Sequence, residues 1–553
     1  MDEGKKFKGD KQSSPIDGFI SDARPLGLPG KRSIYQPKRG HSTPSLGSVM
    51  RLTDGFYPLR ASQGGIGKDM IPEVDEAALL DAPIELDNDS IPKKKYRFGF
   101  QRPKVRKVAK RAGLVLGALV LLLGVYFAAK IYITERHLFR GGGKAPALAA
   151  NVDINQLKGE GDGRVNILLL GIGGVGHDGA DLTDTMMLAS IDPINHSVGL
   201  LSIPRDLWVK MPPGSFVGNY QKINAAYESG KYSYLGKEDA TSGNSKAIQA
   251  GFDTVDSVVS GVLGVPIHYN VLVDFQAFQQ SVDSIGCVSI NVPTELYDPT
   301  VAWENHNSPI VAKPGVQTMC GQQALLYARS RETSSDFARG ERQRALMVAI
   351  KDKTLTLGTF SNPVKVSNLL SSLGTNVYSD FSLGDISRLY QIAQQIPSAS
   401  IKSLDLDTPP NQLVTTADIN GLSAVEPLAG PYDYSAIQSY VRNTLKDSFI
   451  AKENAQIAVY NATDVAGVAT SEGTLLKSYG YSVTTIANTT NLTNPAKTTL
   501  VDLTKGKDKY TRHYLEQRFS VSAVSTIPKS AGVTAPTGTS FVIILGRDVA
   551  TSG

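Results

Sequence analysis

The stretch that decides the fold is VNILLLGI, from Val165 to Ile172, which is followed at once by the glycine-rich turn GGVG. A short, nearly all-apolar run that ends at glycine is typical of a strand buried on both faces of an α/β sheet. Two further runs have the same character, TMMLASI from Thr185 to Ile191 and VGLLSI from Val198 to Ile203. The turn-like hexapeptide DPINHS separates them. These runs predict buried strands in the core of an α/β domain.

Downstream, helical and strand-like segments alternate. Ser245 to Leu263 is a helical stretch, YNVLVDF from Tyr269 to Phe275 is strand-like, and QAFQQSVDSIG predicts the next helix. This alternation predicts a three-layer α-β-α domain over residues 164–450. A second, smaller α/β module is expected over residues 455–549, because IAVYNAT, YSVTTIANTT and SFVIILGRD read as strands and VATSEGTLLKSYG and DKYTRHYLEQRF as helices.

Upstream lies one long apolar run, AGLVLGALVLLLGVYFAA, from Ala112 to Ala129. As a helix it is about 27 Å long, close to the hydrocarbon thickness of a bilayer. It has no polar face, which disfavours the alternative of a buried core helix. We therefore predict a transmembrane helix over residues 112–132. Ten basic residues lie in 93–111 and four in 130–144, so the positive-inside rule places the N-terminus in the cytoplasm and the rest of the chain outside the cell membrane.

Residues 1–92 are rich in Pro, Gly, Ser and mixed charge and have no sustained apolar period. We expect a disordered cytoplasmic tail there, a basic juxtamembrane segment over 93–111, and an extracytoplasmic linker over 133–163. The net charge of +5 is uneven. The first 111 residues hold 22 Lys and Arg against 14 Asp and Glu, and the remainder holds 35 against 38. This distribution argues against nucleic acid as a partner.

Two cysteines, Cys287 and Cys320, lie in the expected external domain. In an oxidising compartment they are expected to form a disulfide that closes a loop of about 33 residues. The alternative is a pair of buried free thiols, which behave as small apolar side chains. Neither has a CxxC neighbour or a His at ligand spacing, so zinc is not expected.

The segment YARSRETSSDFARGERQR, Tyr327 to Arg344, gathers arginines around the single aspartate Asp336. The preceding ALLY reads as core strand, so the two arginines spaced two apart would share one face of a strand. The two spaced three apart would share one face of a helix. Converging guanidinium groups suit a pyrophosphate, because each can donate two parallel hydrogen bonds to phosphate oxygens. A solvated charged helix is the alternative. The arginines are Arg329, Arg331, Arg339, Arg342 and Arg344, with Arg205 contributed from elsewhere.

Two other segments carry candidate chemistry. In SIPRDLWV, Arg205 and Asp206 follow a buried strand, at the edge where α/β sheets bind ligands. In GIGGVGHDGADLTDT, Gly171 to Thr185, a strand rather than a helix follows the glycines, which disfavours a dinucleotide site. Its acids instead offer oxygen ligands that suit Mg²⁺ bound to phosphates. These acids are Asp178, Asp181 and Asp184.

Taken in order, these segments resemble the LytR-CpsA-Psr family of cell-wall glycopolymer transferases over about residues 160–450. The resemblance rests on NILLLG, TDTMMLASIDP, LLSIPRD, KINAAY, VDSIGCV and the block GQQALLYARSR…DFARGERQ. Residues 456–548 resemble the C-terminal module often appended to this family, through VYNAT, the central LVDL and the closing ILGRD. The resemblance implies transfer of a polyprenyl-pyrophosphate-linked glycopolymer to peptidoglycan, with release of polyprenyl phosphate and with Mg²⁺ as cofactor.

The resemblance also implies residue roles. The pyrophosphate would be bound by a set of arginines and a glutamine. Asp184, and with less support Asp181, would bind the metal, and Asp336 would be the base or would orient the acceptor. Arg205 and Arg329 would act with Asp336 in catalysis. Arg344 lies beyond the matched motif and is expected to be a solvated helix residue. The expected pyrophosphate ligands are Arg205, Arg329, Arg331, Arg339, Arg342 and Gln343.

Three positions depart from the family pattern. An acid usual after the first strand is Gly173 here, an arginine usual before the aspartate of the second strand is Leu182, and an expected Gly-Gly pair is Gly286-Cys287. The missing acid keeps open a non-catalytic, membrane-tethered binder of lipid pyrophosphates or wall glycan. Hydrolysis at the same site is a further alternative. A transcriptional regulator is the least favoured reading.

Overall fold

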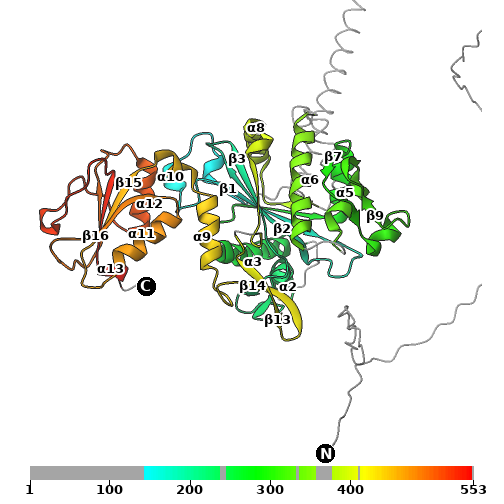
Figure 1. Ribbon diagram of the computed structural model, residues 1–553, viewed down its shortest axis with the longest axis horizontal. Helices are drawn as coiled ribbons and strands as arrows, with labels where there is room; N and C mark the ends of the chain where they lie inside the picture. The colour runs from blue at the N-terminus through cyan, green and yellow to red at the C-terminus, as the bar shows by residue number, and fades with distance from the viewer. Residues whose placement is uncertain (1–141, 237–243, 332–335, 357–376, 409–410, 551–553) are drawn as a thin grey trace, which may run out of the picture. The chain divides into compact units, whose positions relative to one another are not determined.

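The computed structural model describes residues 142–236, 244–331, 336–356, 377–408 and 411–550 (Figure 1). The chain divides into two compact units, Met1–Gly99 and Phe100–Gly553, and every described residue belongs to the second. The expected cytoplasmic tail, basic segment and transmembrane helix lie outside the described residues and stay predictions. Among the helices of the described part, none is both long and apolar enough to cross a membrane.

A six-stranded mixed sheet forms the centre of the larger domain (Figure 1). Its order is β11-β6-β1-β2-β3-β12. Strand β1 is parallel to β6 and antiparallel to β2, and β3 is antiparallel to β2 and parallel to β12. The three apolar runs of the sequence are strands, as predicted, and the structure places them next to one another. The strands span Val165–Ile172 (β1), Thr183–Asp192 (β2), Ser197–Ser202 (β3), Tyr269–Asp274 (β6), Val377–Ser379 (β11) and Ile401–Leu404 (β12).

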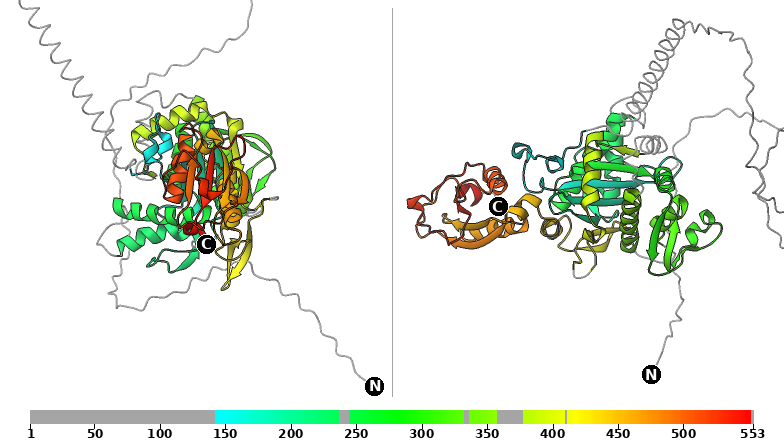
Figure 2. Two further views of the ribbon diagram at one scale, coloured as in Figure 1. Left: turned by 90° about the vertical axis from the view of Figure 1, so that its left-hand side faces the viewer. Right: turned by 90° about the horizontal axis from the view of Figure 1, so that it is seen from above.

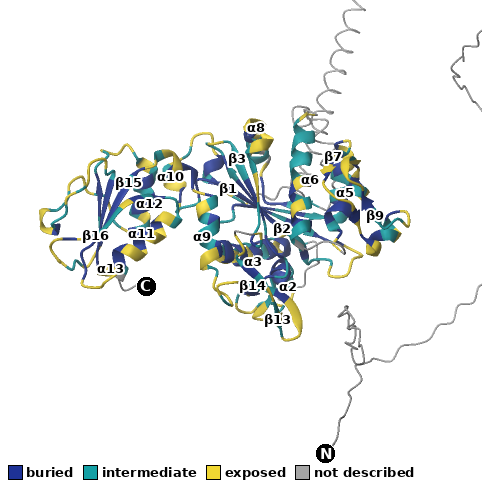
Figure 3. Cartoon of the chain, viewed as in Figure 1, coloured by how far each residue is buried: buried dark blue, intermediate teal, exposed yellow. Residues whose placement is uncertain are grey.

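Helices cover both faces of this sheet, because successive side chains of a strand point to opposite faces. Leu168 and Leu170 of β1 pack in a cluster with α2, α3 and α9. Ile167 of β1 packs on the other face with α8, and α6 contributes Met347 there. Figures 2 and 3 show these layers and their buried interior. The predicted three-layer arrangement is confirmed. The helices are Ala226–Leu235 (α2), Ser245–Leu263 (α3), Asp336–Thr356 (α6), Leu383–Gln395 (α8) and Ser435–Thr444 (α9).

A third apolar cluster lies beside the sheet, between α4, α5, α6 and short strands. Here one prediction is wrong: ALLYAR is part of helix α5, not a strand. Its residues Ala324 to Ala328 are all buried, so the helix is enclosed on several sides and has no polar face that would distinguish it from a buried strand. The elements are Phe275–Ser284 (α4), Val288–Val292 (β7), Leu296–Tyr297 (β8), Ile310–Ala312 (β9), Gly315–Met319 (β10) and Gly321–Arg329 (α5).

A disulfide joins Cys287 and Cys320 in this region. It links the residue before β7 to the residue that precedes α5, and β7 also pairs with β10. In purified protein we expect neither cysteine to react with an alkylating reagent before reduction, and both to react after reduction and unfolding. Intact mass under the two conditions measures this. Two alkylated cysteines in the native protein would contradict the pairing.

Two hairpins lie near the edge of the sheet at which β1 ends. The first joins β4 (Trp208–Lys210) to β5 (Tyr220–Lys222), and the second joins β13 (Val414–Ile419) to β14 (Leu422–Pro427). Leu207 and Val425 form a bridge between them. The second hairpin is thereby fixed to the loop that follows β3.

The C-terminal module contains a four-stranded sheet in the order β16-β15-β18-β17, and helices pack on it, so the predicted α/β module is confirmed. Buried residues of α11 and α12 cover one face, and residues of the loop around Ala531 cover the other. The sequence did not identify the fourth strand, β17. The elements are Gln456–Asn461 (β15), Val468–Ser478 (α11), Ser482–Asn488 (β16), Thr499–Asp502 (β17), Lys509–Phe519 (α12), Phe541–Leu545 (β18) and Arg547–Ala550 (α13).

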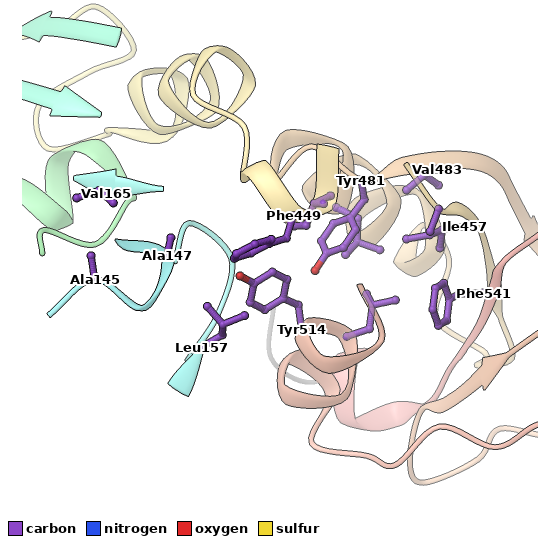
Figure 4. Close-up of a cluster of buried hydrophobic side chains, with 14 of the residues drawn as sticks. Ala145, Ala147, Leu157, Val165, Phe449, Ile457, Tyr481, Val483, Tyr514 and Phe541 are labelled. Atoms are coloured by element: carbon purple, nitrogen blue, oxygen red, sulfur yellow. The ribbon is translucent and has the colours of Figure 1, made fainter. Parts of the chain in front are cut away.

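Residues 142–163 are packed against folded parts of the chain, so the prediction of a flexible linker is wrong for this part. Ala147, Leu148 and Leu157 are buried in a cluster that continues into the C-terminal module (Figure 4). Glu160 forms an ion pair of 2.7 Å with Arg518 of α12. The glycines that suggested flexibility lie before and after these buried apolar residues. The segment therefore packs between the larger domain and the module.

Two carboxyl groups share the side-chain amide of Asn270 in strand β6. The side-chain nitrogen of Asn270 donates to Asp256 at 2.8 Å and to Asp380 at 3.2 Å, and the Asn270 backbone N–H donates to Asp380 at 2.7 Å. Burial raises the pKa of Asp256 to about 7 and that of Asp380 to about 6. The charge of Asp380 raises the pKa of Asp256 further, and the charge of Asp253 raises that of both groups, because like charges disfavour ionisation.

These raised pKa values predict a protein that becomes less stable as the pH rises from 5 to 8. The folded state binds more protons than the unfolded state in this range, where free aspartates have already ionised, so the free energy of unfolding falls with pH. We expect Asp256→Asn to reduce the fall in the free energy of unfolding between pH 5 and 8 by about 1–3 kcal/mol. Urea unfolding at several pH values measures it, with the exposed Asp464→Asn as control. An unchanged pH profile in Asp256→Asn would refute the account.

Candidate active site

Four charged residues lie at one edge of the central sheet because of its topology. Strands β1, β3, β6 and β12 run in the same direction, so their carboxyl ends meet there, together with the start of the antiparallel β2. Asp184 lies at the start of β2, Arg205 and Asp405 follow β3 and β12, and Asp274 ends β6. This is the edge at which α/β sheets bind ligands, as SIPRD predicted.

The N-terminal half of α6 lies over this edge. A Cβ atom at Gly340 would lie 2.9 Å from Oγ of Ser202 at the end of β3, so only glycine allows this approach. The close packing brings Phe337, Arg339 and Gln343 to a narrow polar cleft that Asp184 also lines. The helical spacing expected for Arg339 and Arg342 is confirmed.

Asp184 contacts two arginines at this edge of the sheet. Its carboxylate forms an ion pair of 2.7 Å with Arg205, and its backbone carbonyl accepts a bond of 3.3 Å from the buried Arg339. Arg205 also lies 3.5 Å from Asp206, whose other oxygen pairs with Lys222 at 2.8 Å. The structure thus brings Arg205 and Arg339 together, as expected for two ligands of one anion.

Gln343 and Arg342, one turn further along α6, bond this helix to β2 and to the end of α5. The Gln343 amide donates to Oγ1 of Thr185 at 2.9 Å and to the Ala328 carbonyl at 3.2 Å. The Arg342 guanidinium donates to the carbonyls of Tyr327, at 3.0 Å, and Ser330. Burial lowers the pKa of Arg342, and the nearby charge of Arg339 acts in the same direction. In this arrangement Arg342 braces the end of α5 rather than pointing its donors at a ligand.

The two arginines at the end of α5 have different surroundings. Arg329 pairs with Glu304 at 3.0 Å, and its guanidinium carbon lies 4.4 Å from the ring centroid of Phe275. The Arg331 side chain is exposed, while its backbone N–H donates to Asp298 at 3.0 Å. Because α5 ends at Arg329, the two do not share the face of a strand that the sequence suggested.

The prediction for Arg344 is wrong. Its side chain is only 5% exposed, and it donates to Ser202 at 2.6 Å and to Ser403. It also lies 3.9 Å from Asp405. Burial lowers the pKa of Arg344, although the Asp405 charge opposes this. The residue faces β3 and β12 because α6 crosses the sheet edge, a packing relation that helical periodicity alone does not contain. Arg344 therefore lines the candidate site and cannot serve as a solvated control.

Asp336 is the first residue of α6, but its side chain is outside the described part, so its role stays a prediction. Sequence reasoning missed Phe337, Thr185 and Asp405, all of which line the cleft. Asp405 carried a usable signal, since it follows a strand directly, as Asp206 nearly does. Nothing in the sequence pattern marked the other two.

An apolar cavity of about 190 Å³ adjoins the polar cleft. It opens between β1, β2, β6, α4, α5 and α6, and Arg329 and Asp274 are among its polar lining residues. Burial raises the pKa of Asp274. Thr185 and Gln343 line both spaces, so the cavity and the cleft are neighbours. The apolar walls include Leu169, Val271, Phe275, Phe278, Leu325 and Met347.

The acids available to a metal are fewer than expected. Both oxygens of Asp181 lie 2.7 Å from the ammonium of the buried Lys231, which argues against Asp181 as a metal ligand. A Cβ at Gly173 would lie 2.9 Å from Cβ of His177, so an acid could not be restored there without a shift. Among the described residues, the one group of three with metal-ligand spacing is Asp283 with Cys287 and Cys320, and these two cysteines are joined in the disulfide. Asp184, whose side chain is 42% exposed, and the exposed Asp178 are the remaining candidates.

The fold and site define a class: three-layer α/β proteins in which a polar cleft lined by arginines adjoins an apolar cavity at one edge of the sheet. Comparison with known families agrees. The profile of the LytR_cpsA_psr family matches residues 139–427, and the chain belongs to this family. A second profile, described as LytR cell envelope-related transcriptional attenuator, matches residues 454–548.

Characterised relatives share part of the chain. A protein of Bacillus subtilis named polyisoprenyl-teichoic acid–peptidoglycan teichoic acid transferase TagV is 28% identical over 41% of this chain and 54% of its own length. The Oceanobacillus iheyensis protein of the corresponding name, TagU, is 31% identical over 43% of this chain and 65% of its length. The chain thus spans between about half and two thirds of these relatives. The crystal structure of B. subtilis TagV covers 51% of this chain and 97% of its own, at 25% identity and a TM-score of 0.39.

Proposed function

We propose that this protein transfers a polyprenyl-pyrophosphate-linked glycopolymer to peptidoglycan through a phosphodiester bond. Membership of the family and the names of the relatives support the class of reaction. The observation that carries the proposal is the contact between the apolar cavity and the arginine-lined cleft, which share Thr185 and Gln343. An amphiphile with a long apolar chain and an anionic head matches such a pair of neighbouring spaces.

In the proposed reaction the polyprenyl chain enters the apolar cavity. Arg205 and Arg339 bind the pyrophosphate, with Arg329 at the cavity wall. A hydroxyl oxygen of peptidoglycan attacks the sugar-bearing phosphorus, the bond from this phosphorus to the bridging oxygen breaks, and polyprenyl phosphate leaves. The hydroxyl proton passes to a base, for which Asp336 is the candidate. Guanidinium groups that are already positioned stabilise the charge on the phosphate oxygens.

We further propose Mg²⁺ as cofactor, bound by Asp184 and by phosphate oxygens of the donor. One carboxylate suffices for this fit, since Mg²⁺ in phosphate-transfer sites is commonly held by one or two carboxylates plus substrate oxygens and water. Bound there, the ion would neutralise phosphate charge. Asp184→Asn should therefore raise the Mg²⁺ concentration needed for half-maximal binding of farnesyl pyrophosphate. An identical Mg²⁺ dependence in this variant would exclude Asp184 as a ligand.

The proposal places the described domains outside the cell membrane and the N-terminus in the cytoplasm. Ten basic residues before the apolar run and four after it support this orientation. Protease added to intact spheroplasts should therefore digest both folded domains and leave a protected N-terminal fragment. Immunoblotting with tags at either end measures the outcome. Protection of the C-terminal tag would refute both the topology and the transfer to peptidoglycan.

The decisive experiment uses the full chain in detergent, because Ala147 and Leu148 belong to the core and an N-terminal truncation near residue 150 would remove them. The protein is incubated with a polyprenyl-pyrophosphate oligosaccharide and a peptidoglycan oligomer, and products are identified by mass. The joined phosphodiester product supports the transferase. Binding without any product would favour the non-catalytic binder, and a free sugar phosphate would favour a pyrophosphatase.

A further inference from the structure

Two apolar side chains of the larger domain are strongly exposed. Of the large apolar residues in the described part of the chain, Val175 and Trp303 have the highest exposed fractions, 102% and 76%. Val175 is at the tip of the turn after β1, between Gly174 and Gly176, whose φ angles of 81° and 93° suit glycine. Trp303 belongs to a short 3-10 helix, Pro299–Glu304. Single exposed apolar residues are common, so their position decides whether they indicate a contact.

Both side chains are close to one part of the wall of the apolar cavity. The tryptophan directly precedes Glu304, which pairs with Arg329 at 3.0 Å. The valine lies two residues before His177, whose ring centroid is 5.0 Å from that of Phe275. Arg329 and Phe275 both line the cavity, and the guanidinium carbon lies 4.4 Å from the centroid of the phenyl ring. We therefore call the two exposed side chains the apolar rim of the cavity.

The segment that carries the tryptophan is bound to the end of α5 at two points. Asp298, which caps the 3-10 helix through the Thr300 N–H at 3.0 Å, also accepts from the Arg331 N–H at 3.0 Å. At the other end of this helix, Glu304 pairs with Arg329. The side chain of Arg331 is exposed. Exposed indole and guanidinium groups suit the membrane–water interface, where indole rings lie among the head groups and positive charges attract anionic lipids.

A lipid bilayer lies within reach of the rim. In the proposed topology the membrane span ends at Tyr132, ten residues before Gly142, and ten residues reach about 33–36 Å at most. The chain then joins the sheet beside the start of β6, where the Lys144 N–H donates to the His268 carbonyl at 3.2 Å. Strand β6, which lines the cavity, has six residues and is about 20 Å long. The rim can therefore reach the bilayer surface while the anchor stays in the membrane.

We propose that the apolar rim, Val175 and Trp303, inserts into the outer leaflet of the membrane and holds this side of the cavity at the lipid interface. Tryptophan favours this layer, because its ring is apolar while its N–H bonds to head groups or water. The polyprenyl chain of a donor then passes from the bilayer into the cavity without crossing water. The inference rests on the proposed function for this passage, whereas the contact with lipid is measured without any transfer.

The test uses the two tryptophans of the chain, Trp208 and Trp303. The full chain is reconstituted into vesicles of phosphatidylglycerol and phosphatidylcholine whose acyl chains carry bromine near the head group, where it quenches nearby indole fluorescence. Trp208→Phe, which keeps the rim tryptophan, should lose fluorescence in brominated relative to unbrominated vesicles. Trp303→Phe should emit equally in both. If Trp208→Phe does not fold, the parent serves in its place, since its quenching should disappear in Trp303→Phe.

A second variant tests the other residue of the rim. Val175→Asp should weaken the quenching of Trp303, because a carboxylate is not stable in the apolar part of the interface. Val465→Asp, at an exposed valine of the C-terminal module, is the matched control and should leave the quenching unchanged.

Three results would show that the inference is wrong. Bromine leaves the emission of Trp303 unchanged, bromine quenches Trp208 to the same extent, or the two aspartate variants behave alike. A rim that is shielded from acrylamide in water but not quenched by bromine would be a contact with protein, which also refutes the inference. Failure of the parent to bind farnesyl pyrophosphate would instead overturn the proposed function and leave the measured lipid contact in place.

Discussion

Replacing Arg339 by alanine should lower the affinity for farnesyl pyrophosphate by about 10- to 150-fold, since a charge-assisted hydrogen bond contributes about 1.5–3 kcal/mol. Arg339 is buried, lines the cleft and donates to the backbone of Asp184, so its position is fixed from two sides. Arg339→Lys should restore little, because an ammonium group cannot form the planar pair of bonds that a guanidinium gives to phosphate. Titration calorimetry with farnesyl pyrophosphate measures both variants.

The arginines should not be equivalent, and their ranking tests the geometry. Arg205→Ala is expected to resemble Arg339→Ala, whereas Arg342→Ala should reduce thermal stability more than affinity, because its guanidinium donates to two carbonyls near the end of α5. Arg512, which pairs with Asp502 and Glu516 in the C-terminal module, is the matched control. If Arg512→Ala weakened binding as much as Arg339→Ala, the site would be misplaced.

Replacing Asp447 by alanine should lower the free energy of unfolding by about 3–5 kcal/mol, because several buried donors would lose their acceptor at about 1–3 kcal/mol each. The Asp447 carboxylate caps α10 (Ser448–Glu453) through the N–H groups of Phe449 and Ile450. It also accepts from Gly161 at 3.0 Å, Gly163 at 2.8 Å and the Tyr514 hydroxyl at 3.2 Å. Burial raises the pKa of Asp447, although these N–H donors oppose the shift.

Chemical unfolding followed by circular dichroism measures this loss. Asp433 offers a matched control, because its carboxylate accepts a bond of 3.0 Å from Ser435 at the start of α9 on an exposed surface. Asp433→Ala should cost far less, since water can replace the lost acceptor. Equal effects of the two substitutions would show that burial of the five donors does not matter.

The longer strands of both domains could be predicted because their apolar runs are continuous and end at glycine or polar residues. The short strands β11, β12 and β17 were not identified. Helix α5 could not be predicted, since ALLY is too short to separate a buried helix from a buried strand by periodicity. The error had consequences, because it paired Arg329 with Arg331 across two residues of a strand. In the structure the helix ends at Arg329, and the chain direction changes there.

Arg205, Asp184, Arg339 and Gln343 meet at the sheet edge, and the motifs had marked each of them. Arg344 and residues 142–163 show what the sequence did not contain. Their burial depends on elements distant in the chain, β12 for the arginine and α12 for Glu160. The apolar cavity is equally non-local, since six elements contribute to it. The residue types at these sites can be read along the chain, but the distant residues that they contact cannot.

The apolar layer that joins the larger domain to the C-terminal module has a consequence for descent. Phe449 stacks on Tyr510 with ring centroids 4.1 Å apart, and Leu157 and Ile450 are buried in the same cluster. A deletion of residues 454–553 would remove Tyr510 and expose the side chains of Phe449, Leu157 and Ile450 to water in one step. A lineage could discard the module only after polar residues had replaced them, so the two parts of this chain are expected to have been inherited together.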